Sequence, residues 1–191
     1  QRKYKATTNS RHNYPVAENI LGRQFTASTP NQRWVSDITY IDTAEGWLYL
    51  AVVLDLYSRA IVGWAMDRRM TRQLVADALM MALWRRGKVK GLLLHSDRGS
   101  QYASDDYQKL IKSNGITCSM SRKGNCYDNA AMESFFGTLK QELVHHEHYA
   151  TREQAKASIF EYIEVFYNQQ RRHSAINYLA PMIFEQQTAL A

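Results

Sequence analysis

The first strongly patterned part of this chain predicts three consecutive strands. Residues 34–43 (WVSDITYIDT) alternate between apolar and polar and are rich in β-branched and aromatic side chains, as strands are. Residues 47–55 form a nearly continuous apolar run, which is typical of a strand that is covered on both faces. Residues 60–66 predict a third strand. Because short turns connect the three strands, we expect an antiparallel meander.

Helices and short strands are expected to alternate after the meander. Apolar residues recur at helical spacing, and Thr71, Ser104 and either Asp128 or Asn129 are suitable N-cap residues. Glycines follow the first two helices and are expected to end them. The expected elements are, in chain order, a helix over residues 71–86, a strand over 91–96, a helix over 104–114, a strand over 116–120, a helix from 128 or 129 to about 143, and a helix over 152–168.

The order of these elements defines the expected fold class. Three strands followed by alternating helices and strands predict an α/β protein with a mixed five-stranded sheet, made of three antiparallel meander strands plus two further strands, and with helices on both faces. This order resembles the ribonuclease-H-like fold. We expect residues 34–170 to form the core domain, residues 1–33 to be a polar, basic arm or linker, and residues 171–191 to be a C-terminal extension.

Three acidic residues stand where a carboxylate is unusual or functional. Asp37 lies in the middle of the first strand, where burying a carboxylate without a partner is costly. Asp97 follows the strand that ends at Ser96, and open α/β sheets build their sites at such carboxyl ends. Glu133 lies in the first turns of the third helix, on one face with Asn129. In a ribonuclease-H-like sheet the fourth strand lies beside the first, so we expect the three acids to converge.

Converging carboxylates without a basic partner repel one another, and a hard divalent cation relieves that repulsion. Mg²⁺ or Mn²⁺ prefers oxygen ligands, so we expect Asp37, Asp97 and Glu133 to be the catalytic residues and to hold two such ions. Two ions can activate an attacking oxygen and stabilise a leaving oxygen. Any one acid taken alone is better explained as an ordinary surface or capping residue. We interpret four other acids in that way: Asp55, Asp67, Asp77 and Asp105.

The composition favours a DNA partner and a reducing compartment. The chain has 24 Lys and Arg against 18 Asp and Glu, a net charge of +6, and nucleic acid is the commonest partner of basic proteins. Two cysteines do not make a disulfide framework, so we expect a reducing, cytoplasmic location. No apolar run approaches the roughly 20 residues that span a bilayer, so no membrane partner is expected. The chain does not begin with Met, and we expect it to be part of a longer protein.

The segments around the three acids resemble those of integrase-core transposases, and most closely those of insertion-sequence family three. The matching segments are WVSDITY at 34–40, LDLYSR at 54–59, VGW at 62–64, HSDRGSQY at 95–102, SMSRKGNCYDNA at 119–130, MESFF at 132–136, YN at 167–168 and RRH at 171–173. The step from Asp97 to Glu133 is 36 positions, which leaves 35 residues between them, the spacing of the family's D-D-35-E pattern. These long motifs span nearly the whole chain.

This resemblance implies a DDE transposase, an enzyme that cleaves phosphodiester bonds and transfers DNA strands in a metal-dependent reaction. A water molecule or a DNA 3′-hydroxyl attacks in line, and no covalent enzyme–DNA intermediate forms. The implied partners are transposon ends and target DNA. Joining two ends implies self-association, at least as a dimer, in the active complex. Family members are also expected to carry a helix-turn-helix region ahead of this core.

Basic and polar residues near the acids are candidates for contacts with DNA. These candidates are Arg98, Arg122, Lys123, Asn129, Lys140, Arg171 and Arg172. Arginine suits a phosphate, and a basic loop that contains glycine suits a DNA backbone. Structural alternatives remain open: Asn129 as a helix cap, Lys140 as an ordinary surface residue, and the arginines at 171–172 as favourable charges at a helix end.

Three other functions and one other metal compete with this interpretation. Hydrolytic nucleases such as ribonucleases H and junction resolvases share the expected fold, but the 35-residue gap and the glutamate segment favour a transposase. A non-catalytic DNA-binding or assembly module is disfavoured by the three intact acids, and a phosphatase would not need the basic loop. The two cysteines and the histidines of residues 145–148 match no common zinc spacing, so we reject a zinc site.

Overall fold

A five-stranded mixed sheet forms the centre of the computed structural model, which describes residues 12–122 and 129–189. β1, β2 and β3 pair antiparallel, whereas β4 pairs parallel with both β1 and β5. The predicted fold class, an antiparallel meander extended by two further strands, is confirmed. Across the sheet the strands lie in the order β3 (Ile61–Asp67), β2 (Leu48–Asp55), β1 (Arg33–Ile41), β4 (Leu93–Ser96) and β5 (Thr117–Met120).

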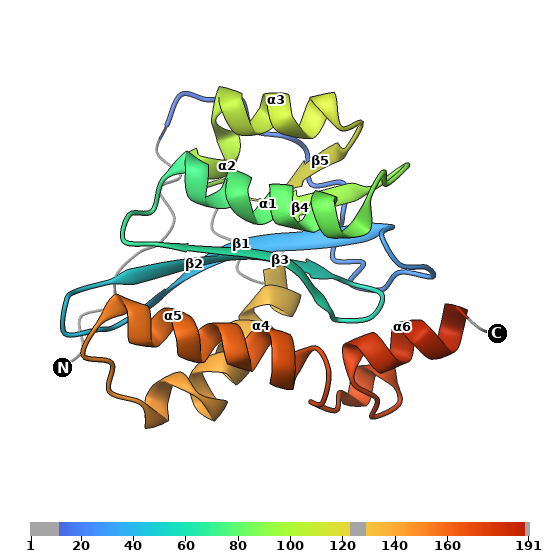
Figure 1. Cartoon of the computed structure of the whole chain (residues 1–191). Helices are drawn as coiled ribbons and strands as arrows, with labels where there is room; N and C mark the ends of the chain where they lie inside the picture. Colours follow the sequence, from blue (N-terminus) through green and yellow to red (C-terminus); the bar gives the residue numbers. More distant parts are fainter. Residues whose placement is uncertain (1–11, 123–128, 190–191) are drawn as a thin grey trace.

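Helices cover both faces of this sheet (Figure 1). One face carries α1 (Arg72–Arg86), α2 (Ser100–Ala103) and α3 (Asp105–Ser113). The other face carries α4 (Ala130–Glu142), α5 (Arg152–Glu161) and α6 (Pro181–Ala189), with the short 3₁₀ segments η2 (Val144–His146) and η4 (Ser174–Ile176) between them. No helix in the described part of the chain is both long and apolar enough to cross a membrane.

The sequence signals at the two ends of α1 act as expected. The Thr71 side chain accepts a hydrogen bond from the Leu74 backbone N–H, as an N-cap does. Gly87 ends the helix with a positive φ of 68°, which glycine adopts without a steric penalty. The predicted bounds of this helix are therefore confirmed.

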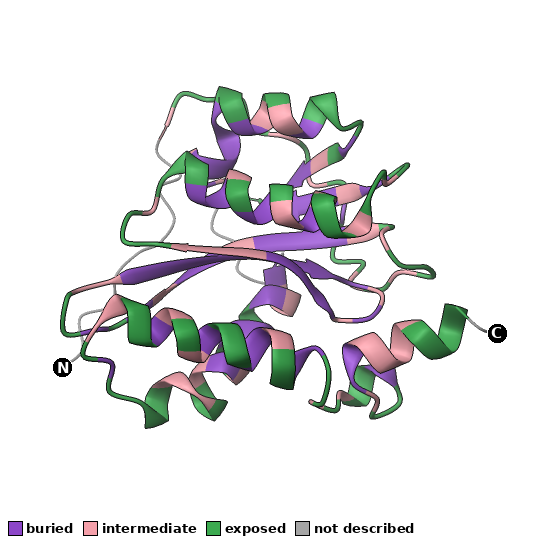
Figure 2. Cartoon of the chain, in the orientation of Figure 1, coloured by how far each residue is buried: buried purple, intermediate pink, exposed green. Residues whose placement is uncertain are grey.

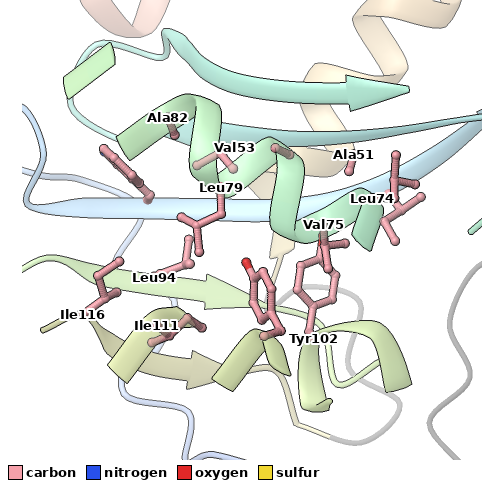
Figure 3. Packing of buried hydrophobic residues seen from close by; sticks show 14 of the residues in the cluster. Ala51, Val53, Leu74, Val75, Leu79, Ala82, Leu94, Tyr102, Ile111 and Ile116 are labelled. Carbon is pink, nitrogen blue, oxygen red and sulfur yellow. The ribbon is translucent and has the colours of Figure 1, made fainter. Parts of the chain in front are cut away.

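Two buried apolar clusters, one on each face of the sheet, hold the layers together (Figure 2). The cluster beneath α1, α2 and α3 includes Trp34, Val75, Leu79 and Tyr102, and Figure 3 labels the last three of these. The cluster beneath α4 and α5 includes the apolar stripe of each helix. All residues of β2 are buried, because helices cover that strand on both faces, as its continuous apolar run predicted.

Two predicted helices differ from those in the structure. The helix expected from Ser104 begins earlier, as α2, and is interrupted at Ser104, whose hydroxyl donates to the Gln101 carbonyl oxygen (2.8 Å) instead of capping α3. The helix expected over residues 152–168 leaves α geometry after α5 and continues as the π-helical turn η3 (Tyr162–Tyr167). A π turn shifts the helical register, and here it buries Tyr162, Ile163 and Tyr167 on one side.

The segments on either side of the core contact it closely. In the N-terminal segment, the Glu18 carbonyl oxygen accepts a hydrogen bond from the Met120 backbone N–H at the end of β5, and Leu21 is buried. In α6, Glu185 forms an ion pair with Arg86 of α1 (2.6 Å). Residues 12–32 and 171–189 thus pack against the sheet and its helices.

We predict that Gly63→Ala destabilises the protein. A Cβ atom at Gly63 would lie 2.2 Å from the Ala78 carbonyl oxygen and 2.7 Å from the Ala82 backbone nitrogen, so α1 would have to move away from β3. Overpacking of this kind costs about 1–3 kcal/mol in the free energy of unfolding, which urea denaturation measures.

Gly137→Ala is the matched control for this prediction. Gly137 lies in α4, and a Cβ atom there would meet nothing within 4 Å. Replacing an interior helical glycine by alanine stabilises by about 0.5–1 kcal/mol. Equal effects of the two substitutions would contradict close packing of α1 on β3.

Candidate active site

The register between β1 and β4 places the first two acids side by side. Ser36 of β1 pairs with Ser96, the last residue of β4, in a parallel ladder. Asp37 and Asp97 follow these residues, so they stand opposite one another at the usual strand spacing of about 4.8 Å. Val35, two positions before Asp37, belongs to the cluster beneath α4, so Asp37 faces α4.

Asp97 is held in the turn that leaves β4. Its Oδ1 accepts a hydrogen bond from the Gly99 backbone N–H (2.8 Å). A Cβ atom at Gly99 would lie 3.0 Å from Asp97 Oδ1 and 3.1 Å from Gln101 Oε1, so a larger residue would crowd the carboxylate. The Gly99 backbone therefore closely approaches the second acid itself.

Asp37 is linked directly to Asn129. Its Oδ1 accepts from the Ile38 backbone N–H (2.7 Å), and its Oδ2 accepts from Asn129 Nδ2 (3.0 Å). Asn129 precedes the first residue of α4, yet its side chain makes no capping hydrogen bond. The interpretation of Asn129 as only a helix cap is therefore wrong, because its amide group is turned toward the first acid.

Glu133 lies on the exposed side of α4, one turn after Asn129. The opposite side of α4 is buried and fixes the helix against the sheet through Met132, Phe135, Phe136 and Leu139. Burial and then the charge of Asp97 raise the pKa of Asp37 to about 8, and the charge of Glu133 acts in the same direction. The three carboxylates are thus close enough for their charges to interact.

The donor atoms at this site fit a hard divalent cation. Among the residues that the structure describes, no three His, Cys, Asp or Glu side chains are close enough together to ligate one ion. The side chains that would bind such an ion, Asp37, Asp97 and Glu133, nevertheless offer carboxylate oxygens, which Mg²⁺ and Mn²⁺ prefer as ligands. Asn129 Oδ1 is buried and has no hydrogen-bond partner within the described ranges, so it is an acceptor that a cation or its water shell would satisfy.

A buried polar network supports the site from below, and the sequence did not predict it. His95 is fully buried between β1 and β5, with Nδ1 2.8 Å from Ser119 Oγ and Nε2 3.1 Å from Ser121 Oγ. Ser119 Oγ also accepts from the Leu21 backbone N–H (3.0 Å). The network thereby joins β4, β5 and the N-terminal segment at His95, which lies two residues before Asp97. A histidine inside an apolar strand was the available signal.

The DNA-binding candidates nearest the acids differ in their surroundings. Arg98 follows Asp97, and its buried Nε has no hydrogen-bond partner in the described part of the chain. Lys140 is half-buried, with Nζ 5.0 Å from the centre of the Tyr40 ring, and burial lowers its pKa, so it is more than an ordinary surface lysine. Arg122 is exposed, and Lys123 lies outside the described residues.

The remaining candidates lie beside α4, at a cavity that α4 also lines. Arg171 forms an ion pair with Glu142, the last residue of that helix (2.7 Å). Its neighbour Arg172 is exposed. The structure therefore groups Asp37, Asp97, Glu133 and Asn129 at one end of α4 and places the two arginines elsewhere.

We predict that Asp37→Asn removes a pH-dependent loss of stability in the metal-free protein. A carboxylate whose pKa rises from 3.8 to about 8 on folding favours the folded state at low pH and loses that contribution as pH rises across this window. Near pH 8, with a chelator present, the variant should thus be more stable than the unchanged protein. Added Mg²⁺ should stabilise the unchanged protein more than it stabilises the variant. Thermal unfolding across pH, with and without Mg²⁺, measures both effects.

Asp77→Asn is the matched control, because Asp77 is exposed on α1, on the opposite face of the sheet. Its pH dependence should follow that of the unchanged protein. An Asp37→Asn variant that loses stability between acidic pH and pH 8 as steeply as the unchanged protein would contradict the charge repulsion described for this site.

Comparison with known sequences agrees with the fold and with the motifs. Two family models, each described as an integrase core domain, match residues 27–126 and 133–189. Transposase InsF for insertion sequence IS3A, from Escherichia coli (strain K12), is 54% identical over 184 residues, which are 96% of this chain and 64% of that protein. The IS600 uncharacterized 31 kDa protein of Shigella sonnei is 53% identical over 186 residues, 97% of this chain and 68% of that protein. The chain thus spans slightly less than two thirds of the length of InsF.

Solved structures of viral integrases share the fold. One solved structure is the simian T-cell lymphotropic virus intasome in complex with PP2A regulatory subunit B56 gamma. The match to one of its chains covers 94% of this chain and 61% of that chain, with a TM-score of 0.69 and 17% identity. The match to the HTLV-2 integrase catalytic core domain in complex with magnesium covers 83% of this chain and 99% of that chain, with a TM-score of 0.62 and 17% identity. The fold is thus the ribonuclease-H-like fold. The first family model alone matches more than half of the residues of this chain, so the chain belongs to the integrase core domain family.

Proposed function

We propose that this chain is the catalytic domain of an insertion-sequence transposase, which cleaves DNA at transposon ends and transfers the strands to target DNA. The observation that carries this proposal is the pairing of Ser36 with Ser96, which sets Asp37 opposite Asp97 while Asn129 and Glu133 approach from α4. The similarity to InsF, which is named as a transposase, supports the choice of reaction. We propose the cytoplasm as the location and DNA as the partner.

The side chains at the site divide the work of binding metal. Asp37, Asp97 and Glu133 would hold two Mg²⁺ or Mn²⁺ ions, and a structural neighbour of this chain is described as magnesium-bound. Such ions, when bound, activate an attacking oxygen and stabilise a leaving one. Asn129 Nδ2 and the Gly99 backbone N–H each hold one carboxylate oxygen and so orient the ligands.

The surrounding cations are our candidates for holding DNA. The Arg98 guanidinium, whose Nε lacks a partner among the described residues, is well suited to a phosphate next to Asp97. We retain the wider set as proposed DNA contacts: Arg98, Arg122, Lys123, Asn129, Lys140, Arg171 and Arg172. Because two ends must be joined, we also propose self-association in the active complex; a structural neighbour is described as an intasome.

Asp37→Asn, Asp97→Asn and Glu133→Gln should each reduce DNA cleavage and strand transfer to background. Each substitution keeps the size of the side chain but removes the charge that binds metal. The assay supplies a DNA substrate with a pre-cut transposon end and Mn²⁺, and it separates strand transfer from simple hydrolysis. Asp77→Asn is again the control and should retain activity, since Asp77 lies on the opposite face of the sheet. Activity retained by any one of the three variants would remove that residue from the proposed site, and hydrolysis without joining by the unchanged protein would favour a nuclease.

Asn129→Ala should lower the rate of strand transfer and raise the Mg²⁺ concentration that gives half of the maximal rate. Loss of a group that orients a metal ligand typically costs about 10- to 100-fold in metal affinity or activity. A Mg²⁺ titration of the strand-transfer rate measures both quantities. An unchanged Mg²⁺ requirement would show that the bond between Asn129 and Asp37 serves only the fold.

A further inference from the structure

A cavity lies against α4, on the side of the helix adjacent to the side that carries Glu133. Its volume is about 560 Å³, which lies within the range of small-molecule sites. α4 contributes Ala130, Ser134 and Thr138, which share one side of the helix. Ser134 follows Glu133 directly, and neighbouring Cα atoms are about 3.8 Å apart. A DNA strand at the acids therefore has only a short path to this cavity.

The lining of this cavity is basic. The described residues that line it include Arg59, Arg171 and Arg172 and no Asp or Glu. Arg171 is neutralised by its ion pair with Glu142. Arg59 and Arg172 have no ion pair among the described residues, so they leave two guanidinium groups available for an anion.

Arg59 is held in place before any ligand binds. Its guanidinium donates to the Phe25 carbonyl oxygen (3.0 Å), and its backbone has a positive φ of 65°. Burial lowers the pKa of Arg59, which means that the charge is kept partly out of water. Asp55 is the carboxylate whose charge acts on Arg59, but its oxygens already accept hydrogen bonds from Asn31 and Tyr57. A second anion is therefore a favourable partner for this guanidinium.

Aromatic side chains accompany these cations. Phe25 and Tyr167 line the cavity, and Tyr178 lies at its edge with 68% of its surface exposed. Tyr178 has a positive φ of 57°, a conformation that is uncommon and costly for a bulky residue. The bond from its backbone N–H to the His173 carbonyl oxygen (2.9 Å) holds this conformation. The chain thus keeps a large exposed ring beside two unpaired cations at some cost in backbone strain.

We propose that this cavity binds one unpaired nucleotide of the DNA that the domain processes, with Arg59 and Arg172 on its phosphate and Tyr178 stacked on its base. Cationic side chains that follow the backbone, together with aromatic rings that stack on bases, are the chemistry by which proteins bind single strands. The inference rests on the proposed function, because it assigns a place to the strand beside the acids. It goes beyond that function in assigning roles to Arg59 and Tyr178.

The test compares a blunt DNA duplex with the same duplex carrying a short single-stranded 3′ overhang. Binding of the 191-residue chain is measured by fluorescence anisotropy with Ca²⁺ in place of Mg²⁺, since Ca²⁺ also takes oxygen ligands. The unchanged protein should prefer the overhang. Tyr178→Ala should weaken overhang binding about tenfold and change blunt-duplex binding by no more than about twofold. Arg172→Ala should weaken overhang binding more than it weakens blunt-duplex binding. Both positions are exposed, so these variants avoid the packing role of Arg59.

Matched controls remove the same kind of group from distant surfaces. Arg68→Ala removes an exposed charge beyond β3, and Trp84→Ala removes an exposed ring on α1. Both controls should bind the two DNAs as the unchanged protein does. Equal loss of blunt and overhang binding in Arg172→Ala, with no effect of Tyr178→Ala, would overturn the nucleotide site in favour of a backbone contact alone. No preference for the overhang in the unchanged protein would also overturn it.

A parallel strand-transfer assay with Mn²⁺ separates this inference from the proposed function. An unchanged protein that transfers strands, while Tyr178→Ala and Arg172→Ala bind the overhang normally, refutes the cavity and leaves the proposed function intact. An unchanged protein that prefers the overhang but neither cleaves nor joins DNA refutes the proposed function and keeps the nucleotide site.

Discussion

The parallel pairing of β1 with β4 is the constraint on which the rest of the site depends. It brings two aspartates from positions 60 residues apart to adjacent places on the sheet, because Ser36 and Ser96 are paired. A slip by one residue would turn Asp37 to the other face of the sheet, away from α4 and toward the cluster beneath α1. Burial on both sides of the strand prevents such a slip, since Trp34 and Val35 each fill a different core.

The same pairing creates a cost that the protein does not relieve by itself. Two carboxylates are held close together and partly away from water, which raises the pKa of Asp37. Within residues 12–122 and 129–189, Asp37 accepts hydrogen bonds from a backbone N–H and from the amide of Asn129, and from no cationic side chain. Repulsion that is left in place at a site lined with oxygen atoms is an arrangement that a divalent cation would relieve. The predicted instability of the metal-free site and its proposed affinity for metal would thus be two consequences of one geometry.

The sequence was a good guide wherever a local signal determined the outcome. The continuous apolar run of β2 predicted a strand buried on both faces, and Thr71 and Gly87 predicted the ends of α1. The signal failed where a side chain had two possible partners. Ser104 and Asn129 are both good N-cap residues, but each bonds elsewhere, to Gln101 and to Asp37. Only the folded chain decides between a local and a distant partner.

Other long-range features were beyond the reach of the sequence for a related reason. The His95 network joins residues from β4, β5 and the N-terminal segment, and a histidine within an apolar strand does not reveal which partners the fold brings to it. The π-helical turn η3 buries Tyr162, Ile163 and Tyr167, and the apolar spacing of residues 152–168 did not distinguish it from a continued α-helix. The basic cavity depends on residues that are far apart in sequence, from Phe25 to Tyr178.

α4 connects the two regions that we assign to DNA. Its buried stripe anchors it to the sheet, which leaves Glu133 on one exposed side and Ser134 on the next. A rigid helix with both side chains on adjacent residues fixes the distance between the acids and the cavity, so a strand that occupies both is held in one register. Positioning of this kind needs no movement of the protein, because the helix and the sheet already hold both regions in place. In the proposed function, Glu133 would therefore do more than complete a set of ligands: through α4 it would link the placement of the metal ions to the placement of the strand on which they act.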